Sequence, residues 1–197
     1  ATAIAEYFRD QGKNVLLMDA DLGLANVDVM LGLKPEYNLS HLFNGERTLE
    51  ELIVQGPEGL NIIPAASGIS RMADLEPAEH SGLIQAFSEL SMPLDVLLVD
   101  AAAGVSDSVI SFVKASQEVI VVVCNEPASI TDAYALIKLL SRDYGMNRFN
   151  LVLNFVQGAR EGEHTVQTIK QVTQRFLKLE LAHLGNIPDD KSVKRAV

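Results

Sequence analysis

Acidic side chains directly follow two of the most apolar runs in this sequence. Asp19-Ala20-Asp21 ends the run N-V-L-L-M-D, and Asp100 ends the run D-V-L-L-V-D. No Lys or Arg nearby in the sequence neutralises these carboxylates. Mg²⁺ relieves such repulsion and is commonly bound through one or two carboxylates plus substrate phosphates. The pattern indicates magnesium-dependent phosphate chemistry if the carboxylates converge, whereas polar strand ends alone fit an ordinary turn equally well.

Six short apolar runs must position these groups, over residues 14–19, 60–64, 95–100, 118–124, 150–155 and 183–188. Most are continuously apolar, which predicts strands covered on both faces, as in a parallel sheet. Helical spacing separates them, with one stripe at Ala133, Leu136, Ile137, Leu140 and Tyr144 and another at Val166, Ile169, Thr173 and Phe176. This alternation predicts one α/β domain over residues 1–197, a doubly wound, mostly parallel sheet flanked by helices.

Ligands of such sheets bind beyond the carboxyl ends of the strands, so the residues after each run are candidates. The fourth run ends in Asn125-Glu126-Pro127, the fifth carries Asn154, and the sixth ends in Pro188-Asp189-Asp190. We expect these residues and the two aspartate motifs to line the same rim.

The composition disfavours nucleic-acid-binding and membrane-spanning proteins. The 197 residues are 48% hydrophobic, and 26 acidic against 16 basic residues give a net charge of -10. Coating a phosphate backbone needs clustered Lys and Arg, so no direct nucleic-acid partner is expected. No apolar run approaches the roughly 20 residues of a membrane-spanning helix. The single Cys124 cannot form an internal disulfide, which favours the cytoplasm.

Four segments together resemble one family. V-L-L-M-D-A-D-L-G-L-A-N-V-D-V-M-L-G-L over residues 15–33, D-V-L-L-V-D-A-A-A-G, V-V-V-C-N-E-P-A-S-I-T-D-A-Y-A-L-I-K-L-L and G-N-I-P-D-D are similar to the deviant-Walker ATPases of the MinD and ParA group. The likeness runs from Ala1 to Val197 and is strongest to the FlhG/FleN branch, which regulates flagellar number. It implies a P-loop NTPase-like fold with ATP and Mg²⁺ as cofactors.

The resemblance also implies roles for individual residues. By it, Asp21 positions the attacking water, while Asp19 and Asp100 lie near Mg²⁺ through its waters. Asn154 reads adenine, and the turn that contains Pro188 and Asp190 packs beside the base. The catalytic residue is thus expected to be Asp21, with cofactor-binding and metal-site residues on the other strand ends.

The switch implied by this likeness forms a homodimer when ATP is bound and dissociates after hydrolysis. Its partners would be an FlhF-type GTPase, a flagellar transcription activator and flagellar base components. The complete protein would be cytoplasmic with peripheral association at the inner membrane, through a C-terminal amphipathic helix that Lys191–Val197 does not supply.

This sequence departs from the family pattern in three places. Ala101 stands where the family has Thr, and Asn125 stands where it has Asp. No G-x-x-x-x-G-K-[ST] phosphate loop is present, and Gly12-Lys13 instead fits a helix C-cap before a strand. In the family, the strand before that loop lies between the D-V-L-L-V-D and V-I-V-V-V strands. We therefore expect residues upstream of Ala1, because two strand edges would otherwise remain unpaired.

Two other functions remain open at this point. The chain could be a non-catalytic body that binds partners, because its phosphate loop is missing. Alternatively, Asp19 and Asp21 could be the nucleophile and acid of a D-x-D phosphatase, although Gly23 stands where that class has Thr or Val. A thermal shift with ATP and Mg²⁺ separates the switch from the non-catalytic body, since a ligand that binds the native state raises its stability.

Overall fold

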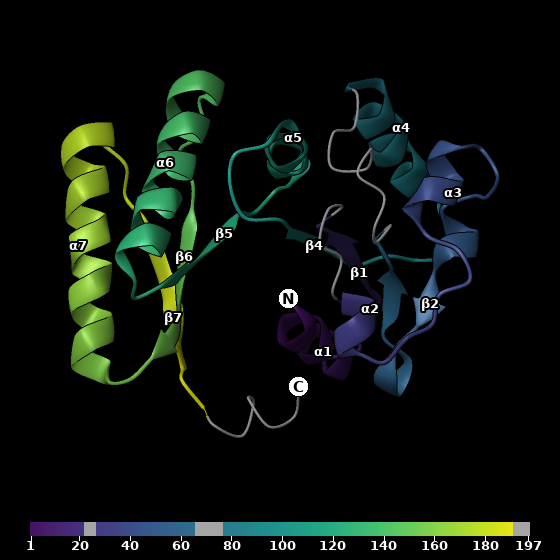
Figure 1. Cartoon of the computed structure of the whole chain (residues 1–197), viewed down its shortest axis with the longest axis horizontal. Coiled ribbons are helices and arrows are strands. Elements are labelled where there is room, and N and C mark those ends of the chain that lie inside the picture. Colours follow the sequence, from purple (N-terminus) through teal and green to yellow (C-terminus); the bar gives the residue numbers. More distant parts are fainter. Residues whose placement is uncertain (22–26, 66–76, 191–197) are drawn as a thin grey trace. The chain divides into compact units, whose positions relative to one another are not determined.

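The computed structural model of this chain describes residues 1–21, 27–65 and 77–190, in two compact units, Ala1–Ala115 and Ser116–Val197. Unit 1 contains α1 (Thr2–Asp10), β1 (Val15–Ala20), α2 (Val27–Met30), α3 (Leu39–Phe43), η1 (Glu50–Leu52), β2 (Val54–Gln55), η2 (Pro57–Gly59), β3 (Asn61–Ile63), α4 (Pro77–Ser88), β4 (Val96–Ala101) and α5 (Asp107–Ala115). Unit 2 contains β5 (Ile120–Cys124), α6 (Pro127–Tyr144), β6 (Asn150–Val156), α7 (Ala159–Leu177) and β7 (Ala182–Pro188). Figure 1 shows both units.

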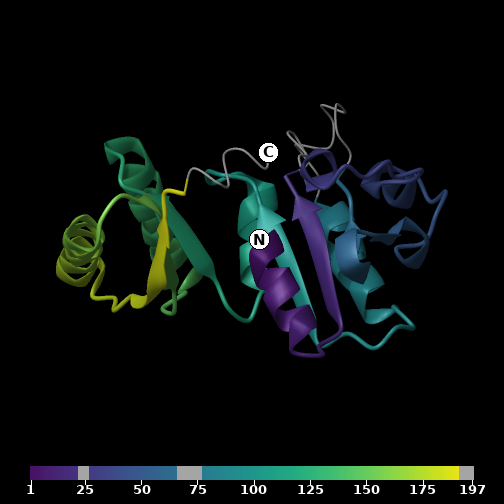
Figure 2. The same cartoon turned by 90° about the horizontal axis from the view of Figure 1, so that it is seen from below.

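The sheet of unit 1 has the strand order β2-β3-β1-β4. β1 pairs in parallel with both β3 and β4, whereas the short β2 is antiparallel to β3. Helix α1 lies against β1 (Figure 2) and ends before Gly12, whose φ of 76° supports the predicted C-cap. The central strand is therefore β1, which carries Asp19 near its carboxyl end.

Strand β1 is central because its side chains are apolar on both faces. Leu16 and Met18 pack into one buried cluster, and Val15 and Leu17 pack into another. In a strand, alternate side chains point to opposite faces, so the two clusters lie on opposite sides of the sheet. All six residues of β1 are buried, as a parallel strand covered on both faces requires.

Unit 2 has a three-stranded parallel sheet in the order β5-β6-β7. Helices α6 and α7 contact each other, and they contact β5 and β6 respectively (Figure 1). Val121 and Val123 are buried, whereas Ile120 and Val122, on the alternate face of β5, are exposed. One face of this sheet is therefore only partly covered, although continuous apolar runs predicted coverage on both faces.

All six predicted strands are present, within one or two residues of the expected bounds. The doubly wound, mostly parallel α/β class is confirmed, although β2 was not predicted. In the helical stripes, Tyr144 and Phe176 are exposed rather than in the core. The single-domain assignment over residues 1–197 stays a prediction.

Four strands, β2, β4, β5 and β7, have one neighbour each among the described residues. β4 pairs with β1, and β5 pairs with β6. The sequence predicted one unpaired edge on each of β4 and β5. Within the described ranges, no helix is long and apolar enough to cross a membrane.

Candidate functional site

The three aspartates singled out in the sequence of unit 1 lie at one rim of its sheet. Asp19 of β1 is in register with Asp100 of β4, and Asp21 follows β1 by one residue. In adjacent parallel strands, residues in register lie side by side and point to the same face. The structure therefore places Asp19, Asp21 and Asp100 at one rim of the sheet, and the roles that the resemblance implies for them stay predictions.

Asp19 is buried, with 1% of its surface exposed, and both carboxylate oxygens accept backbone hydrogen bonds. The amide of Asp21 donates to Oδ1 at 3.1 Å, and the amide of Val27 donates to Oδ2 at 3.1 Å. Val27 begins α2, so Asp19 ties the end of β1 to the start of that helix. Residues 22–26, including Gly23, lie outside the described residues.

Metal binding by this rim requires ligands from elsewhere. Among the described residues, no three His, Cys, Asp or Glu side chains converge as a metal site. Asp21 and Asp100 are half-buried, whereas Asp19 is already held by the backbone. This donor set fits contact with the water shell of Mg²⁺ beside phosphate oxygens better than an all-protein metal cage.

The residues predicted to contact the base lie at the carboxyl edge of unit 2. Asn154 is in register with Cys124, and Pro188 is in register with Val156. Asp190 follows β7 by two residues and is exposed. These predicted base contacts therefore share one rim within unit 2.

The backbone bends sharply where the predicted adenine contact lies. Phe155 has a φ of 56°, in the left-handed region that few non-glycine residues adopt, and its ring is half exposed. Its amide donates to Asn154 Oδ1 at 3.0 Å. Such strain persists only where the surroundings enforce it, which makes this end of β6 a candidate binding element.

Sequence analysis missed a polar network at the same rim, formed by Asn125, Gln157, Glu161 and Thr165. The signal that points to it is Asn125, one of the positions that depart from the family pattern. Its partners on α7 could not be found without the fold, because they lie 36 and 40 residues away in the chain.

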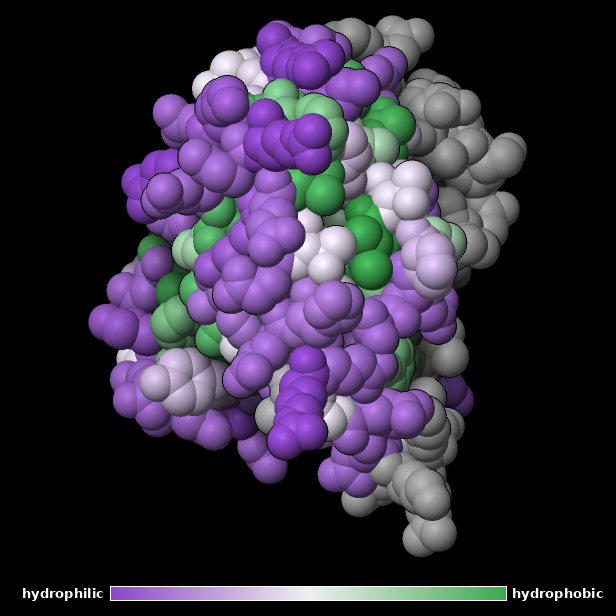
Figure 3. Space-filling view, turned by 90° about the vertical axis from the view of Figure 1, so that its left-hand side faces the viewer, coloured by the Kyte–Doolittle hydropathy of each residue, from purple (hydrophilic) through white to green (hydrophobic). Residues whose placement is uncertain are grey.

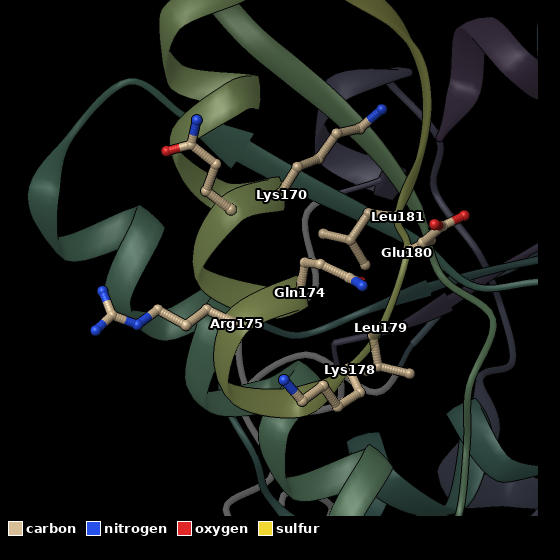
Figure 4. A pocket seen from close by; sticks show the side chains of 8 residues that line it. Lys170, Gln174, Arg175, Lys178, Leu179, Glu180 and Leu181 are labelled. Atoms are coloured by element: carbon tan, nitrogen blue, oxygen red, sulfur yellow. The ribbon is translucent and has the colours of Figure 1, made fainter.

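A separate cavity of about 580 Å³ lies at the other end of unit 2 (Figure 4). It lies beside the last turns of α7 and the segment that leads into β7, and its lining includes Lys170, Lys178, Leu179 and Leu181. The side of the molecule that carries α7 is mainly hydrophilic (Figure 3). Because the cavity lies toward the amino ends of the strands, it is not part of the rim that carries Asn154.

Comparison with known proteins places the rims in context. The model of the CobQ/CobB/MinD/ParA nucleotide binding domain matches residues 1–197. The chain is 54% identical over 188 residues to antiactivator FleN of Pseudomonas aeruginosa, covering 95% of this chain and 67% of that protein. It is 35% identical to the flagellum site-determining protein YlxH of Helicobacter pylori, covering 95% and 63%. The chain therefore spans about two thirds of the length of these relatives.

Solved structures show the same fold. A chain of the MinC:MinD cell division protein complex of Aquifex aeolicus matches with a TM-score of 0.75 at 26% identity, over 98% of this chain and 76% of that one. MinD of Pyrococcus horikoshii, solved with Mg-ADP, matches with a TM-score of 0.75 at 21% identity, over 98% and 75%. The second likeness is evidence for the fold alone.

Proposed function

Since the chain belongs to the CobQ/CobB/MinD/ParA nucleotide-binding domain family, we propose that it is the body of an ATP-hydrolysing switch that regulates flagellar number and placement. The relatives FleN and YlxH support the flagellar output. The observation that supports ATP hydrolysis is that Asp19 and Asp100 are in register at the carboxyl ends of adjacent strands, with Asp21 at the same rim. Three carboxylates at the carboxyl ends of adjacent parallel strands suit a magnesium-bound phosphate.

In this proposal Asp21 aligns the water that attacks the terminal phosphate. The backbone amide of Asp21 donates to Asp19, whose other carboxylate oxygen accepts from the amide of Val27. The backbone at Asp21 is therefore positioned before the ligand arrives. Bound Mg²⁺ would neutralise phosphate charge, with Asp19 and Asp100 facing its water shell. Phosphoryl transfer of this kind depends on positioning and charge stabilisation.

The base would be recognised at the rim of unit 2. Asn154 offers an amide to the edge of adenine, while Pro188 and Asp190 flank the base. The left-handed backbone at Phe155 supports this assignment, because a strained residue at a strand end is typical of binding loops.

The proposal requires a phosphate-binding segment that these 197 residues do not contain. We propose that its strand pairs with the second edges of β4 and β5. The support is that each of these strands has one neighbour among the described residues. Such a strand would supply both edges with backbone partners and place a glycine-rich loop beside the carboxylates.

The switch would act through a homodimer formed with ATP. Its partners would be an FlhF-type GTPase, a flagellar transcription activator and components of the flagellar base. Localisation would be cytoplasmic, with reversible contact to the inner membrane through a terminal amphipathic helix. Residues 191–197 lie outside the described part of the chain.

The phosphatase alternative is disfavoured by the surroundings of Asp19. A nucleophilic carboxylate must reach the phosphorus atom, whereas Asp19 is buried and accepts two backbone hydrogen bonds. A thermal shift with ATP and Mg²⁺ distinguishes the switch from a non-catalytic body that only binds partners.

The decisive experiment compares Asp21→Ala with the unsubstituted protein when a phosphate-binding segment precedes Ala1. We expect ATP turnover to fall at least about 100-fold, the scale of one lost catalytic group, while ATP still binds. Asp107→Ala, an exposed aspartate in the first turn of α5, is the control and should keep full turnover. Unchanged turnover in Asp21→Ala would refute the role of Asp21. The absence of a thermal shift of the unsubstituted protein with ATP and Mg²⁺ would favour the non-catalytic body.

A further inference from the structure

Asn125 joins the end of β5 to helix α7 through both ends of its amide group. Its Nδ2 donates to Glu161 Oε1, and its Oδ1 accepts from Thr165 Oγ1 at 2.6 Å. Glu161 lies in the first turn of α7, and Thr165 lies one turn later with 4% of its surface exposed. The orientation of the amide follows from chemistry, because an ionised carboxylate can only accept.

Glu161 extends this network to the loop after β6. Its second oxygen, Oε2, accepts from the backbone amide of Gln157 at 3.1 Å. Gln157 lies two residues after Phe155, whose left-handed backbone falls near the end of β6. One carboxylate therefore links the end of β5, the β6–α7 loop and the start of α7.

We propose that Asn125 is a positioning residue that, through Glu161, holds the β6–α7 loop in place directly after the end of β6 that carries Asn154. This inference rests on the proposed function only in assigning the loop to the base. An aspartate at this position, which the family pattern has, would lose the donor that Glu161 requires. Two carboxylates would then share one site, and like charges in contact repel each other. Asn125 and Glu161 are thus matched to each other.

The matching can be tested by reversing donor and acceptor. Asn125→Asp should weaken the loop when residue 161 is Glu. With Glu161→Gln also present, the new side-chain amide can donate to one carboxylate oxygen at position 125, and its own oxygen can still accept from the Gln157 backbone amide. The second carboxylate oxygen at position 125 can then accept from the Thr165 hydroxyl. Glu161→Gln alone is tolerated because the Asn125 amide can turn over and donate to the Thr165 hydroxyl. Asn125→Asp should therefore loosen the β6–α7 loop when residue 161 is Glu and have little effect on the loop when residue 161 is Gln.

The primary readout is hydrogen exchange at the Gln157 amide in the 197-residue chain, without nucleotide. We expect Asn125→Asp to speed this exchange by about tenfold or more, because the bond to Glu161 is weakened, and the double variant to return it to within about threefold of the unsubstituted chain. Nearly equal exchange in the single and double variants would overturn the proposal. So would a lower melting temperature with unchanged Gln157 exchange.

The chain offers a matched control at the amino end of β6, the strand that leads into the β6–α7 loop. Asn150 Nδ2 donates to Glu118 Oε2 at 3.0 Å, so Asn150→Asp also brings two carboxylates together. This pair lies at the amino end of β6, away from the loop. Asn150→Asp should leave Gln157 exchange within about threefold of the starting value, because local opening is confined to the contacts removed. Faster Gln157 exchange in this control would show a general effect of charge and would also overturn the proposal.

Affinity for ATP is the second readout, measured when a phosphate-binding segment precedes Ala1. Asn125→Asp should weaken ATP binding about tenfold, and Glu161→Gln should restore it, because the loop is then held again. If exchange responds as expected but affinity does not, the network positions the loop and the assignment of that loop to the base is wrong. Failure of the exchange experiment removes the positioning role and leaves the proposed function untouched.

Discussion

Strands β1 and β5 both come from predominantly apolar runs but have different surroundings. β1 is buried at every position, pairs with strands on both edges and packs against a cluster on each face. β5 alternates between buried and exposed residues and pairs with one strand among the described residues. A continuous apolar run therefore indicates that a strand can be covered on both faces, whereas the neighbouring elements decide whether it is.

The two units also differ in charge. Residues 1–115 contain 17 acidic and 6 basic side chains, whereas residues 116–197 contain 9 acidic and 10 basic ones. The net charge of -10 thus comes from the first unit, which also carries the three rim carboxylates. An acidic field raises the local concentration of cations, so the first unit is the one that would attract Mg²⁺.

The largest expected effect tests the packing difference directly. Leu17→Ala removes a fully buried side chain from β1 and should lower the free energy of unfolding by about 2–5 kcal/mol. Val122→Ala in β5, where 56% of the residue's surface is exposed, should cost about 0.5 kcal/mol. Urea denaturation followed by circular dichroism measures both. Equal losses would show that Val122 is covered in the folded protein and that the contrast between β1 and β5 is wrong.

The next prediction concerns the register pair on the acidic rim. Asp19→Asn leaves one backbone donor facing an amide donor, so we expect a loss of about 1–3 kcal/mol in the free energy of unfolding. Asp100→Asn, at a half-buried position on the adjacent strand, should change stability by about 0.5 kcal/mol or less. Both variants are measured by denaturation without nucleotide. If Asp100→Asn were the more damaging, Asp19 would not be the residue that holds the turn.

Much of the fold could be predicted from the sequence because strand positions depend on local apolar runs. Asp19 and Asp100 could be placed at one rim because each ends such a run, and parallel strands bring their carboxyl ends together. The exposed face of β5 could not be predicted, since the sequence of a strand does not show which elements will cover it. The partners of Asn125 were missed for a related reason, because Glu161 and Thr165 become its neighbours only when the first turns of α7 reach the residue that follows β5.

A pair of glycines, one in each unit, gives a smaller effect. A Cβ at Gly162 in α7 would lie 2.8 Å from Asn186 Nδ2 and 3.1 Å from Val156 Cγ1. Gly162→Ala should therefore destabilise the protein by about 1 kcal/mol, since overpacking outweighs the gain in helix propensity. Gly82→Ala in α4 meets nothing within 4 Å and should stabilise by about 0.5–1 kcal/mol.

Thermal unfolding of these two glycine variants checks the signs. Stabilisation by both substitutions would mean that α7 does not pack closely on β6 and β7. The network between Asn125 and Glu161 would then lack the rigid helix on which it depends. Destabilisation by both would instead show that the exposed surface of α4 is covered in the folded protein.

The smallest effect is a pH dependence specific to unit 1. The backbone amide of Thr48 donates to Glu51 Oε2 at 2.8 Å, and this bond, together with one from the Thr48 hydroxyl, lowers the pKa of Glu51. A carboxyl group with a lowered pKa stabilises the folded state above its ordinary pKa, and this contribution is lost as the pH falls through the lowered value. Glu51→Gln should therefore cost most at neutral pH and little near pH 3. Exposed Glu163 on α7, replaced in the same way, is the control, and a fall in stability of equal size and pH dependence would mean that the bonds from Thr48 do not set the behaviour of Glu51.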